Sequence, residues 1–364
     1  MSSLVQDETT NIISNEKEDF LRVMQLSSGL ILPMILKTVI ELDLFELMAK
    51  AGPNAQLSAI EISSLLPTKN PEAPVMLDRI LKFLASFSFL NCNVIADEQG
   101  GAKTLYSSAP ICKKFLPDED GISLASLLML PVDKAHFDSW YHLKDAILEG
   151  GIPFIRAHGA DAFEQPIKDT RFFDVFNKAL HNHACMVMKR LLEVYKGFEE
   201  VKELVDVGGG HGGTLSCIVA KYPNIRAINY DIPQVVECAA PRSGVEFVRG
   251  NMFESIPKGE VMMMKWVLHD WDDDHCVTIL KNCYEALPEN GKLIVIELVL
   301  PETPNGDTIS KIGYQFDINM LSVNTGGKER TEKEFEHLAT QAGFASIKLI
   351  CRADCDWVIE FYKN

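Results

Sequence analysis

The stretch LVDVGGGHGG (residues 204–213) places an apolar run directly before a cluster of glycines, and a helical pattern follows it. This order is typical of a strand, a tight turn and a helix in an α/β domain. Glycines let the backbone pass close beneath a ligand and open the N-terminus of the helix toward it. Asp231 closes the next apolar run, 23 residues after Gly208, where a carboxylate can accept from both hydroxyls of a ribose. The stretch therefore predicts a nucleoside-type cofactor.

The sequence around this stretch alternates short apolar runs with helical patterns, which indicates a parallel sheet with crossover helices. The runs are ELVDVGGG, RAINYD, VEFVRG, VMMMKWVL and GKLIVIELVL. The last segment, SIKLICRADCDWVIEFYKN (346–364), holds two strand-like runs with too few residues between them for a crossover helix. These two strands should pair antiparallel.

The glycine cluster is compatible with two cofactors. Gly208, Gly210 and Gly213 satisfy the Gly-x-Gly-x-x-Gly pattern of nicotinamide dinucleotides. The Asp-x-Gly-x-Gly-x-Gly pattern suits S-adenosylmethionine, which has no pyrophosphate to hold. The motif lies deep in the C-terminal half, and the chain ends in the antiparallel pair; neither is usual for dinucleotide folds. The order of elements favours the methyl donor, and an NAD-linked oxidoreductase is the alternative.

The N-terminal part has the outline of a winged helix. Residues 18–50 and 57–90 contain helical patterns, and NCNVIADEQGGAKTLYSSAP (91–110) predicts a hairpin. Many DNA-binding domains share this outline. However, the third helix contains Asp78, Arg79 and Lys82 rather than a basic face. The same layout works as a dimerisation domain, with a winged-helix regulator as the alternative.

Composition narrows the class of protein. A net charge of −16 and a pI near 5.0 argue against nucleic acid as a partner. The stretch SGLILPMILKTVIELDLFELM (28–48) is interrupted by Pro33 and Lys37, so we expect an amphipathic helix rather than a membrane span. Nine scattered cysteines, of which only Cys351 and Cys355 are close, lack the paired spacing of a zinc site. With a polar, acidic start instead of a signal peptide, these features predict a reduced, cytoplasmic enzyme.

The stretch KWVLHDWDDDHC (265–276) ends an apolar run in an imidazole and several carboxylates. A general base, a metal site and the start of a helix are all compatible with this pattern. We interpret residues 272–274 as the acidic first turn of a helix and His275 as a surface residue, with a metal cluster as the alternative.

Taken in order, LVDVGGGHGG, GNMFESIPKG, KWVLHDWDDDHC, IVIELVLPE and NTGGKERTEKEF resemble the motifs of plant caffeic-acid-type O-methyltransferases. SWYHLKDAILEGGIPF and LPTKNPEAPVMLDRILKFLAS extend the resemblance over nearly the whole chain. It implies a homodimer that methylates small phenols without a metal. It also implies a winged-helix-like dimerisation domain (1–115), a helical segment contributing to the substrate pocket (116–200) and a Rossmann-like, S-adenosylmethionine-binding domain (201–364).

The resemblance assigns a set of residues to the cofactor. Gly208 and Asp231 would hold the methionine and ribose parts, Met252 and Phe253 would flank the adenine, and Lys265 would lie along the cofactor. The usual GDMF is here GNMF. Asn251 thus replaces a carboxylate that accepts from the adenine amino group, and its amide oxygen can still accept.

The same resemblance makes His269 the general base, with Glu297 and Glu329 as the carboxylates that bracket it and Asp270 as a supporting residue. A phenol, like Tyr, has a pKa of about 10, against about 6.5 for His. The gap of about 3.5 units costs about 5 kcal/mol, which proton transfer concerted with attack can absorb. An aliphatic alcohol, near water at about 15.7, would set a much larger gap. The chemistry favours a phenolic acceptor without excluding an allylic alcohol.

The implied acceptor pocket contains Phe172, Phe176, Leu180, His183, Met320 and Asn324, and the partner subunit's Met24 would close it. Four positions depart from caffeate-type members: Leu130, Pro131, Pro166 and Asn319. Since such positions read ring substituents, the sequence predicts a phenylpropanoid acceptor (hydroxycinnamic acid, aldehyde, monolignol or phenylpropene) without naming it. A flavonoid, coumarin or alkaloid phenol is the alternative.

Overall fold

In the computed structural model of the chain, the described residues are 16–96, 101–162 and 169–364. The chain divides into two compact units, Met1–Val132 and Asp133–Asn364. After a helix at Glu16–Ser27, the first unit contains α2 (Ile31–Glu41), α3 (Leu44–Lys50), α4 (Ala59–Leu65), α5 (Ala73–Ser86), β1 (Leu90–Ala96), β2 (Ala102–Ser108), η1 (Pro110–Lys114) and α6 (Ala125–Met129).

The winged-helix outline predicted from the sequence is confirmed. Helix α5 buries Leu77, Leu81 and Leu84, which share one face because they are four and three residues apart. Strands β1 and β2 pair antiparallel, as the hairpin pattern predicted. Helix α4 begins at a capping box in which Ser58 and Glu61 satisfy each other's backbone N–H groups.

The N-terminal unit extends past residue 115. Phe115, Leu116 and Leu128 pack against its hydrophobic core, and burial of these side chains keeps the segment up to Val132 with this unit. The predicted helical segment 116–200 is therefore divided between the two units. Within the described part of the chain, no single helix has the length and hydropathy needed to cross a membrane; Glu16–Ser27 and Ile31–Glu41 meet both only as a bent pair.

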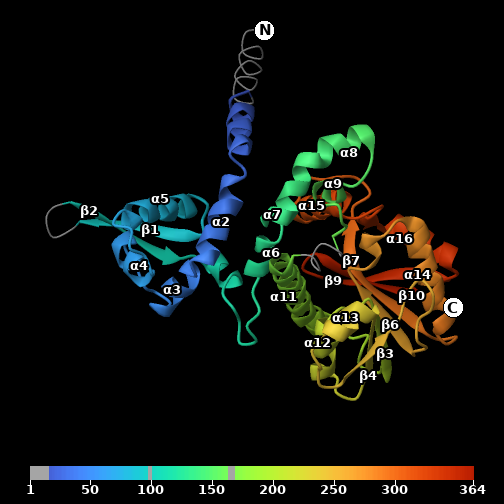
Figure 1. Ribbon diagram of the computed structural model, residues 1–364. Coiled ribbons are helices and arrows are strands. Elements are labelled where there is room, and N and C mark those ends of the chain that lie inside the picture. Colours follow the sequence, from blue (N-terminus) through green and yellow to red (C-terminus); the bar gives the residue numbers. More distant parts are fainter. Residues whose placement is uncertain (1–15, 97–100, 163–168) are drawn as a thin grey trace, which may run out of the picture. The chain divides into compact units, whose positions relative to one another are not determined.

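The second unit begins with short helices and continues into a doubly covered sheet (Figure 1). Its helical elements are α7 (Lys134–Ser139), η2 (Trp140–His142), α8 (Leu143–Glu149), α9 (Pro153–His158), α11 (Thr170–Val194), α12 (Gly213–Lys221), α13 (Pro233–Cys238), η3 (Leu268–Asp270), α14 (Asp273–Ala286), α15 (Thr308–Val323) and α16 (Glu332–Ala342). Its strands are β3 (Glu203–Val207), β4 (Arg226–Asp231), β5 (Val245–Arg249), β6 (Val261–Lys265), β7 (Lys292–Leu300), β8 (Arg330–Thr331), β9 (Ser346–Ala353) and β10 (Asp356–Tyr362).

The sheet has the order β5-β4-β3-β6-β7-β10-β9, with β8 paired to β7. Strands β3 to β7 run parallel, whereas β10 is antiparallel to both β7 and β9. The prediction of a mixed sheet with an antiparallel last strand is confirmed. Because the parallel strands end at one edge, the residues that follow β3, β4, β6 and β7 gather there.

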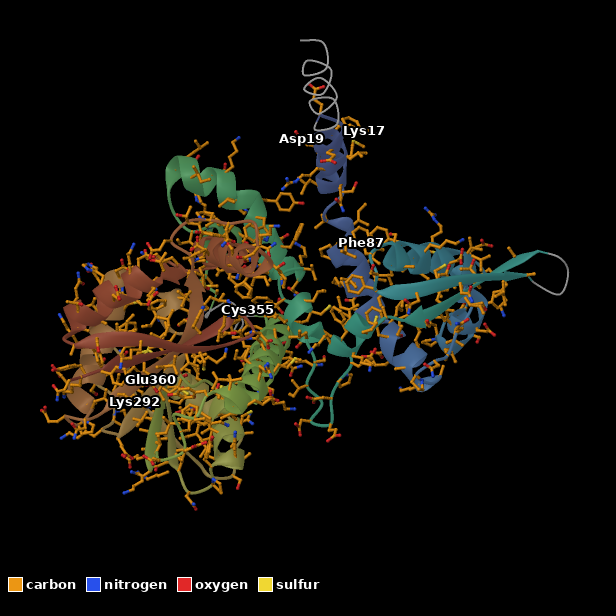
Figure 2. All side chains as sticks on the ribbon, turned by 180° about the vertical axis from the view of Figure 1, so that it is seen from behind. Lys17, Asp19, Phe87, Lys292, Cys355 and Glu360 are labelled. Atoms are coloured by element: carbon orange, nitrogen blue, oxygen red, sulfur yellow. The ribbon has the colours of Figure 1, made fainter. Side chains whose placement is uncertain are left out.

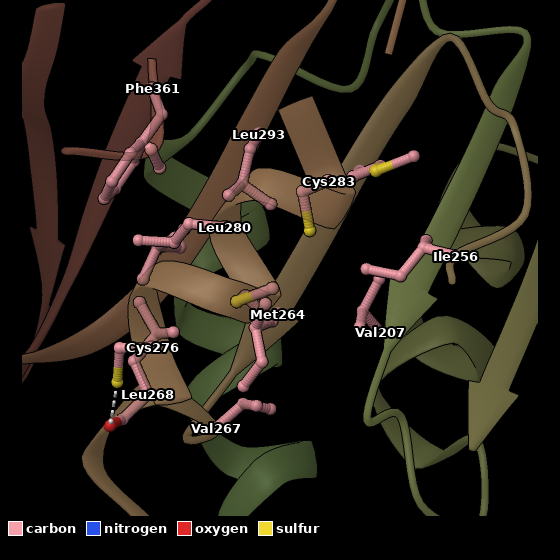
Figure 3. Packing of buried hydrophobic residues seen from close by; sticks show 14 of the residues in the cluster. Val207, Ile256, Met264, Val267, Leu268, Cys276, Leu280, Cys283, Leu293 and Phe361 are labelled. Carbon is pink, nitrogen blue, oxygen red and sulfur yellow. Dashed lines mark hydrogen bonds between the residues drawn. The ribbon is translucent and has the colours of Figure 1, made fainter. Parts of the chain in front are cut away.

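Both faces of the sheet are covered by helices, and side chains alternate between two hydrophobic cores. Met262 and Met264 face α14 and α16, whereas Val261 and Met263 face α11 and α12. Figure 3 shows the first of these cores, in which the Cys276 thiol donates to the Leu268 carbonyl at 3.2 Å. That bond ties helix α14 to the segment that follows β6.

Paired strands β7 and β10 also carry a buried polar cluster that holds helix α11 to the sheet. The Nζ of Lys292 lies 2.6 Å from Oε1 of Glu360, and the two side chains are adjacent in Figure 2. The hydroxyl of Tyr195, just after α11, donates to the same carboxylate. A buried carboxylate with a cation and a hydroxyl as partners is compensated, so it stabilises one register of the strands.

Replacing Tyr106 with Phe tests the packing of the hairpin on helix α5. The Tyr106 side chain is fully buried, and its hydroxyl donates to Oδ1 of Asp78 at 2.7 Å. We expect Tyr106→Phe to lower the free energy of unfolding of the N-terminal unit by about 1–2 kcal/mol, measured by calorimetry. Tyr141→Phe, at a side chain that is 74% exposed, is the control. Equal melting temperatures for the two variants would contradict this account of the hairpin.

Candidate active site

The glycine loop between β3 and α12 forms the floor of the predicted cofactor site. Gly208 has a φ of +71°, and a Cβ there would lie 2.9 Å from Cγ2 of Val267. Both the backbone conformation and the contact therefore require glycine. The N–H of Gly210 donates to Oδ2 of Asp231 at 2.8 Å, and the N–H of Ile232 donates to Oδ1 at 2.7 Å. The loop thus orients the carboxylate predicted to bind the ribose.

Beneath the loop, two buried polar atoms lack hydrogen-bond partners within the described part of the chain. Oδ2 of Asp206 and Oδ1 of Asn229 make no hydrogen bond with the described residues. A Cβ on Gly209 would lie 2.8 Å and 2.2 Å from these two atoms. Burial, and then the charge of Asp231, raise the pKa of Asp206 to about 8. Orphaned acceptors of this kind fit a ligand that carries positive charge and N–H donors, as the methionine part of S-adenosylmethionine does.

The segment predicted to hold the adenine is ordered by its own side chains. Oδ1 of Asn251 accepts from the N–H of Phe253 at 3.0 Å, and Nδ2 donates to Glu254 at 3.1 Å. An amide oxygen has a second lone pair, so Asn251 can still accept one bond from a ligand. Met252 and Phe253 pack against the core that faces α14, and Phe253 meets the Trp271 ring edge-on at 4.7 Å.

The predicted general base is buried among carboxylates. Nδ1 of His269 lies 2.9 Å from Oε1 of Glu329 and 3.8 Å from Oε2 of Glu297. Because an ionised carboxylate only accepts, Nδ1 carries the proton in this pair. Both glutamates therefore approach the same ring nitrogen, and none of the described residues forms a hydrogen bond with Nε2. Oδ1 of Asp270 lies 3.6 Å from it.

The carboxylates determine how basic this imidazole is. Burial disfavours its charged form, but Glu297, Glu329 and Asp270 outweigh this effect and raise the pKa of His269 to about 10. Burial raises the pKa of Glu297 to about 7 and that of Asp270 to about 6. None of the described residues forms a hydrogen bond with the buried Oε2 of Glu297 or Oε2 of Glu329. The environment thus favours a protonated imidazole.

Backbone and buried side chains fix the position of these groups. Oε1 of Glu297 accepts from the N–H groups of Val267 and Leu268, both at 2.9 Å. Glu297 is fully buried, so these two donors hold its carboxylate inside the protein. The N–H of Lys328 donates to the carbonyl of His269 at 2.9 Å. A Cβ on Gly327 would lie 2.8 Å from that carbonyl oxygen, so glycine permits the close approach.

Arg330 is a site residue that the sequence did not single out. Its guanidinium is fully buried and donates to the carbonyls of Leu268 and Trp271, both at 2.7 Å, and to Oδ1 of Asp273. It therefore holds both sides of the short helix η3, which carries His269. In the sequence Arg330 stands between the predicted carboxylate Glu329 and a helix start, where charged residues are common.

Aromatic rings surround one side of the imidazole. The Trp266 ring lies 5.5 Å from His269, 5.4 Å from Phe316 and 4.1 Å from His183, on which it stacks. His183 was predicted at the edge of the acceptor pocket, whereas Trp266 and Phe316 were missed. Trp266 has a φ of +55°, a conformation that costs a bulky residue about 1–3 kcal/mol and persists only when its surroundings enforce it.

The structure connects some of the other predicted pocket residues. Nδ2 of Asn324 donates to Oδ1 of Asp270 at 2.6 Å and lies 3.6 Å from Sδ of Met320. On the same helix, α15, Oδ1 of Asn319 lies 2.6 Å from Nε2 of the buried His136, a polar contact that the sequence did not suggest. Asn319 and Met320 in α15 and Asn324 at its C-terminal cap therefore form one segment that reaches Asp270, the residue after the proposed base.

For the other residues predicted to line the acceptor pocket, the structure gives the surroundings of three, the unit of two and no description of one. Phe172 is fully buried between Phe154 and Phe176, at ring distances of 6.2 Å and 6.1 Å, and Leu180 is half-buried two turns further along α11. Leu130 and Pro131 belong to the N-terminal unit, and Pro166 lies outside the described residues. The roles of these six residues in substrate binding stay predictions.

The acidic residues after His269 form a helix start. Asp272 caps α14 by accepting from the N–H of His275 at 2.9 Å, and Asp273 and Asp274 occupy its first turn. The exposed His275 bonds to Asp272, as expected for a surface residue. Among the described residues, ligand atoms of His269, Glu297 and Glu329 lie within 4.8 Å of one another, a spacing that could also accommodate a metal ion.

Comparison with known proteins identifies the family. Residues 140–345 match the model of an O-methyltransferase domain, and residues 24–118 match an O-methyltransferase dimerisation domain. The chain belongs to this O-methyltransferase family. It is 52% identical to caffeic acid 3-O-methyltransferase of Catharanthus roseus over 363 residues, covering 100% of both chains. It is 51% identical to esculetin O-methyltransferase of Kitagawia praeruptora over 355 residues, or 98% of each.

A solved structure shows the same fold. Human N-acetylserotonin methyltransferase, crystallised in complex with SAM, superposes with a TM-score of 0.80 at 22% identity and covers 95% of this chain and 98% of its own. The resemblance seen in the motifs is thus confirmed. The protein is an S-adenosylmethionine-dependent O-methyltransferase, so the NAD-linked oxidoreductase and the winged-helix regulator are set aside.

Asp231→Ala tests the cofactor site of this O-methyltransferase. We expect it to weaken binding of S-adenosylmethionine and of its demethylated product by about tenfold or more, since the ribose loses a charged acceptor. Titration calorimetry measures both affinities. Glu237→Ala removes an exposed carboxylate on α13 and serves as the matched control. Unchanged affinity in Asp231→Ala would refute the assignment.

Proposed function

We propose that this O-methyltransferase methylates a phenolic hydroxyl of a phenylpropanoid-type molecule, with His269 as the general base. The acceptors in this class are hydroxycinnamic acids, aldehydes, monolignols and phenylpropenes. The observation that carries the proposal is the buried imidazole, whose Nδ1 faces Glu329 and Glu297 while Nε2 has no hydrogen bond from the described residues. Such an imidazole can receive a proton at Nε2 and spread its charge over two carboxylates.

The raised basicity of His269 matches the acidity of a phenol. With the pKa of His269 raised to about 10, transfer of a proton from a phenol of pKa about 10 is nearly thermoneutral. A neutral imidazole of ordinary pKa would face a deficit of about 5 kcal/mol in this step, but it needs no prior loss of a proton near neutral pH, whereas His269 with its raised pKa does. An aliphatic alcohol has a pKa near that of water, about 15.7. The gap to the pKa of His269 would then be about 6 units, which costs about 8 kcal/mol at about 1.36 kcal/mol per unit. These differences favour a phenol over an allylic alcohol.

The names of the relatives agree with an aromatic hydroxyl acceptor. The curated proteins named above are a caffeic acid 3-O-methyltransferase and an esculetin O-methyltransferase. The second of these names keeps a coumarin acceptor as a further candidate, beside flavonoids and alkaloid phenols. The polar contact between Asn319 and His136 lies on the helix that reaches Asp270, and it gives the proposed acceptor site a polar element.

Residues of this chain would hold the cofactor by complementary charge and hydrogen bonds. S-Adenosylmethionine, when bound, supplies an electrophilic methyl group and a positive charge. Asp206 would accept from its methionine amino group, Asp231 from the ribose hydroxyls and Asn251 from the adenine amino group. The buried Lys265, whose pKa is lowered by burial, would lie along the cofactor. His269 then needs only to take the acceptor's proton.

We propose further that the enzyme is a homodimer whose partner subunit's Met24 closes the acceptor site. The match to a dimerisation domain supports the first part. Exposed apolar side chains lie along the helix Glu16–Ser27 and continue into α2. An apolar surface of this kind favours burial against another chain. These side chains are Phe20, Leu21, Val23, Met24, Leu26, Leu30, Ile31 and Met34. The cytoplasmic location stays a prediction from the sequence.

The dimer is tested by introducing charge into this surface. We expect the wild-type chain to sediment as a dimer and the double variant Val23→Glu, Leu26→Glu to shift to monomer, because burying carboxylates at an interface is costly. Analytical ultracentrifugation measures the mass. Val94→Glu, at a 62% exposed position of β1, is the control. A wild-type monomer at micromolar concentration, or a double variant that stays dimeric, would contradict the proposal.

The variant His269→Gln tests the base. We expect turnover to fall by about 10² to 10⁴, the usual effect of a general base, while donor affinity stays close to wild type. The exposed His275→Gln is the matched control. Retention of more than about a third of wild-type turnover, with chemistry shown to limit the rate, would refute His269 as the base.

The pH profile tests the raised basicity. The imidazole accepts a proton only when neutral, so with a pKa raised to about 10 the wild-type rate should rise with pH well above neutrality. In the wild type, this rise should occur at the same pH for phenols of different acidity, because His269 sets it. In His269→Gln the rise should follow the pKa of each phenol instead. A wild-type limb near pH 6.5, or one that follows the phenol, would contradict the account.

Removal of metal ions separates the base from the alternative metal site. We expect full activity after exhaustive chelation, since a strong base is present and the reaction needs no Lewis acid. Initial rates before and after chelation, with metal content checked by mass spectrometry, give the answer. A loss of activity that added magnesium or zinc restores would assign His269, Glu297 and Glu329 to a metal instead.

A further inference from the structure

Asp356 carries a buried carboxylate that the proposed methyl transfer does not use. We propose that Asp356 is a positioning residue, which fixes the indole of Trp266 and thereby the ring wall beside His269, and that it sets the enzyme's affinity for the acceptor. This inference rests on the proposed function, because it assumes that the phenol binds next to Nε2 of His269. Asp356 itself does not touch the base in this arrangement.

The antiparallel end of the chain brings this carboxylate to the site. Asp356 is the first residue of β10, is 1% exposed, and pairs with Leu298, which follows Glu297 on β7. Its Oδ1 accepts from Nε1 of Trp266 at 2.5 Å. The indole N–H is the only hydrogen-bond donor of a tryptophan side chain, so this one bond fixes the direction of the ring.

Trp266 needs such a restraint. Its backbone has a φ of +55° immediately after β6, where its N–H donates to the carbonyl of Ile296 at 3.1 Å. A bulky residue keeps this conformation only when its surroundings enforce it. The indole also stacks on His183, meets Phe316 edge-on and is tilted against His269. Rotation of the indole would therefore displace the other rings.

Besides its hydrogen bond to Trp266, Asp356 also acts on the neighbouring Lys265 through its charge. Nζ of Lys265 lies 4.1 Å from the centre of the Trp266 ring, and Asp356 is the leading negative charge that opposes the burial of this lysine. Asp356 can thus act through a hydrogen bond or through its charge. Asn keeps an acceptor oxygen for the indole and lacks the charge. Asp356→Asn therefore distinguishes positioning of Trp266 from compensation of Lys265.

The experiment compares Asp356→Ala, Asp356→Asn, Trp266→Phe and the double variant Asp356→Ala, Trp266→Phe with the wild type. The acceptor is the phenol that the wild type methylates fastest in a panel, with S-adenosylmethionine at saturation. We expect Asp356→Ala to raise the acceptor KM by about tenfold and to lower kcat by less than about threefold, because the loss concerns binding geometry. Asp356→Asn should restore KM to within about threefold of wild type.

Trp266→Phe removes the same bond from the other side, so it also serves if Asp356→Ala fails to fold. It should raise KM by a similar factor, and the double variant should add little to it, since residues that act as a unit are not additive. The indole ¹⁵N–¹H spectrum reports the bond without any acceptor: the signal missing in Trp266→Phe should shift in Asp356→Ala and exchange faster with solvent.

Three results would overturn the positioning role: an unchanged acceptor KM in folded, active Asp356→Ala, a failure of Asp356→Asn to restore KM, or full additivity in the double variant. These results leave the proposed function intact. A wild-type enzyme that methylates no phenol in the panel would instead refute the proposed function, and the indole spectrum would still show whether Asp356 fixes Trp266.

Discussion

The contact between the buried imidazole of His269 and the carboxylate of Glu329, 2.9 Å apart, is the interaction on which the active site depends. A buried carboxylate pair without a cation would be costly, so Glu297 and Glu329, which both face Nδ1, favour protonation of the His269 ring. The same preference makes His269 a strong proton acceptor. The surrounding structure, from the buried Arg330 to the backbone donors of Val267 and Leu268, keeps these three groups together.

Much of this organisation could be predicted from local patterns. The glycine loop, the strand-ending Asp231 and the antiparallel last strands follow from spacing and chain order, because each depends on residues close together in the sequence. Parallel strands end at one edge of a sheet, so His269, which follows β6, and Glu297, in the C-terminal half of β7, could be expected near each other. Their roles came from the resemblance to a family rather than from periodicity.

The rest depends on contacts between distant residues, which no local pattern contains. Arg330 reaches the carbonyls of Leu268 and Trp271, and Asp356 bonds to Trp266 across 90 residues. In sequence both look like ordinary charged residues beside a helix or a strand. The polar pair of His136 and Asn319 is equally invisible, since a lone histidine in an amphipathic stretch reads as surface. The raised pKa of His269 could not be predicted from the sequence either, because it depends on how many carboxylates lie close to the ring.

The most direct test of the central claim is the titration of the His269 imidazole itself, followed by ¹⁵N NMR in the wild type and in Glu329→Gln, with His269→Gln used to assign the signal. The carboxylates should hold the pKa of this ring far above the ordinary value of about 6.5, near 10, and loss of one carboxylate should lower it clearly. A ring that titrates at or below about 6.5, or one that Glu329→Gln leaves unchanged, would contradict the account.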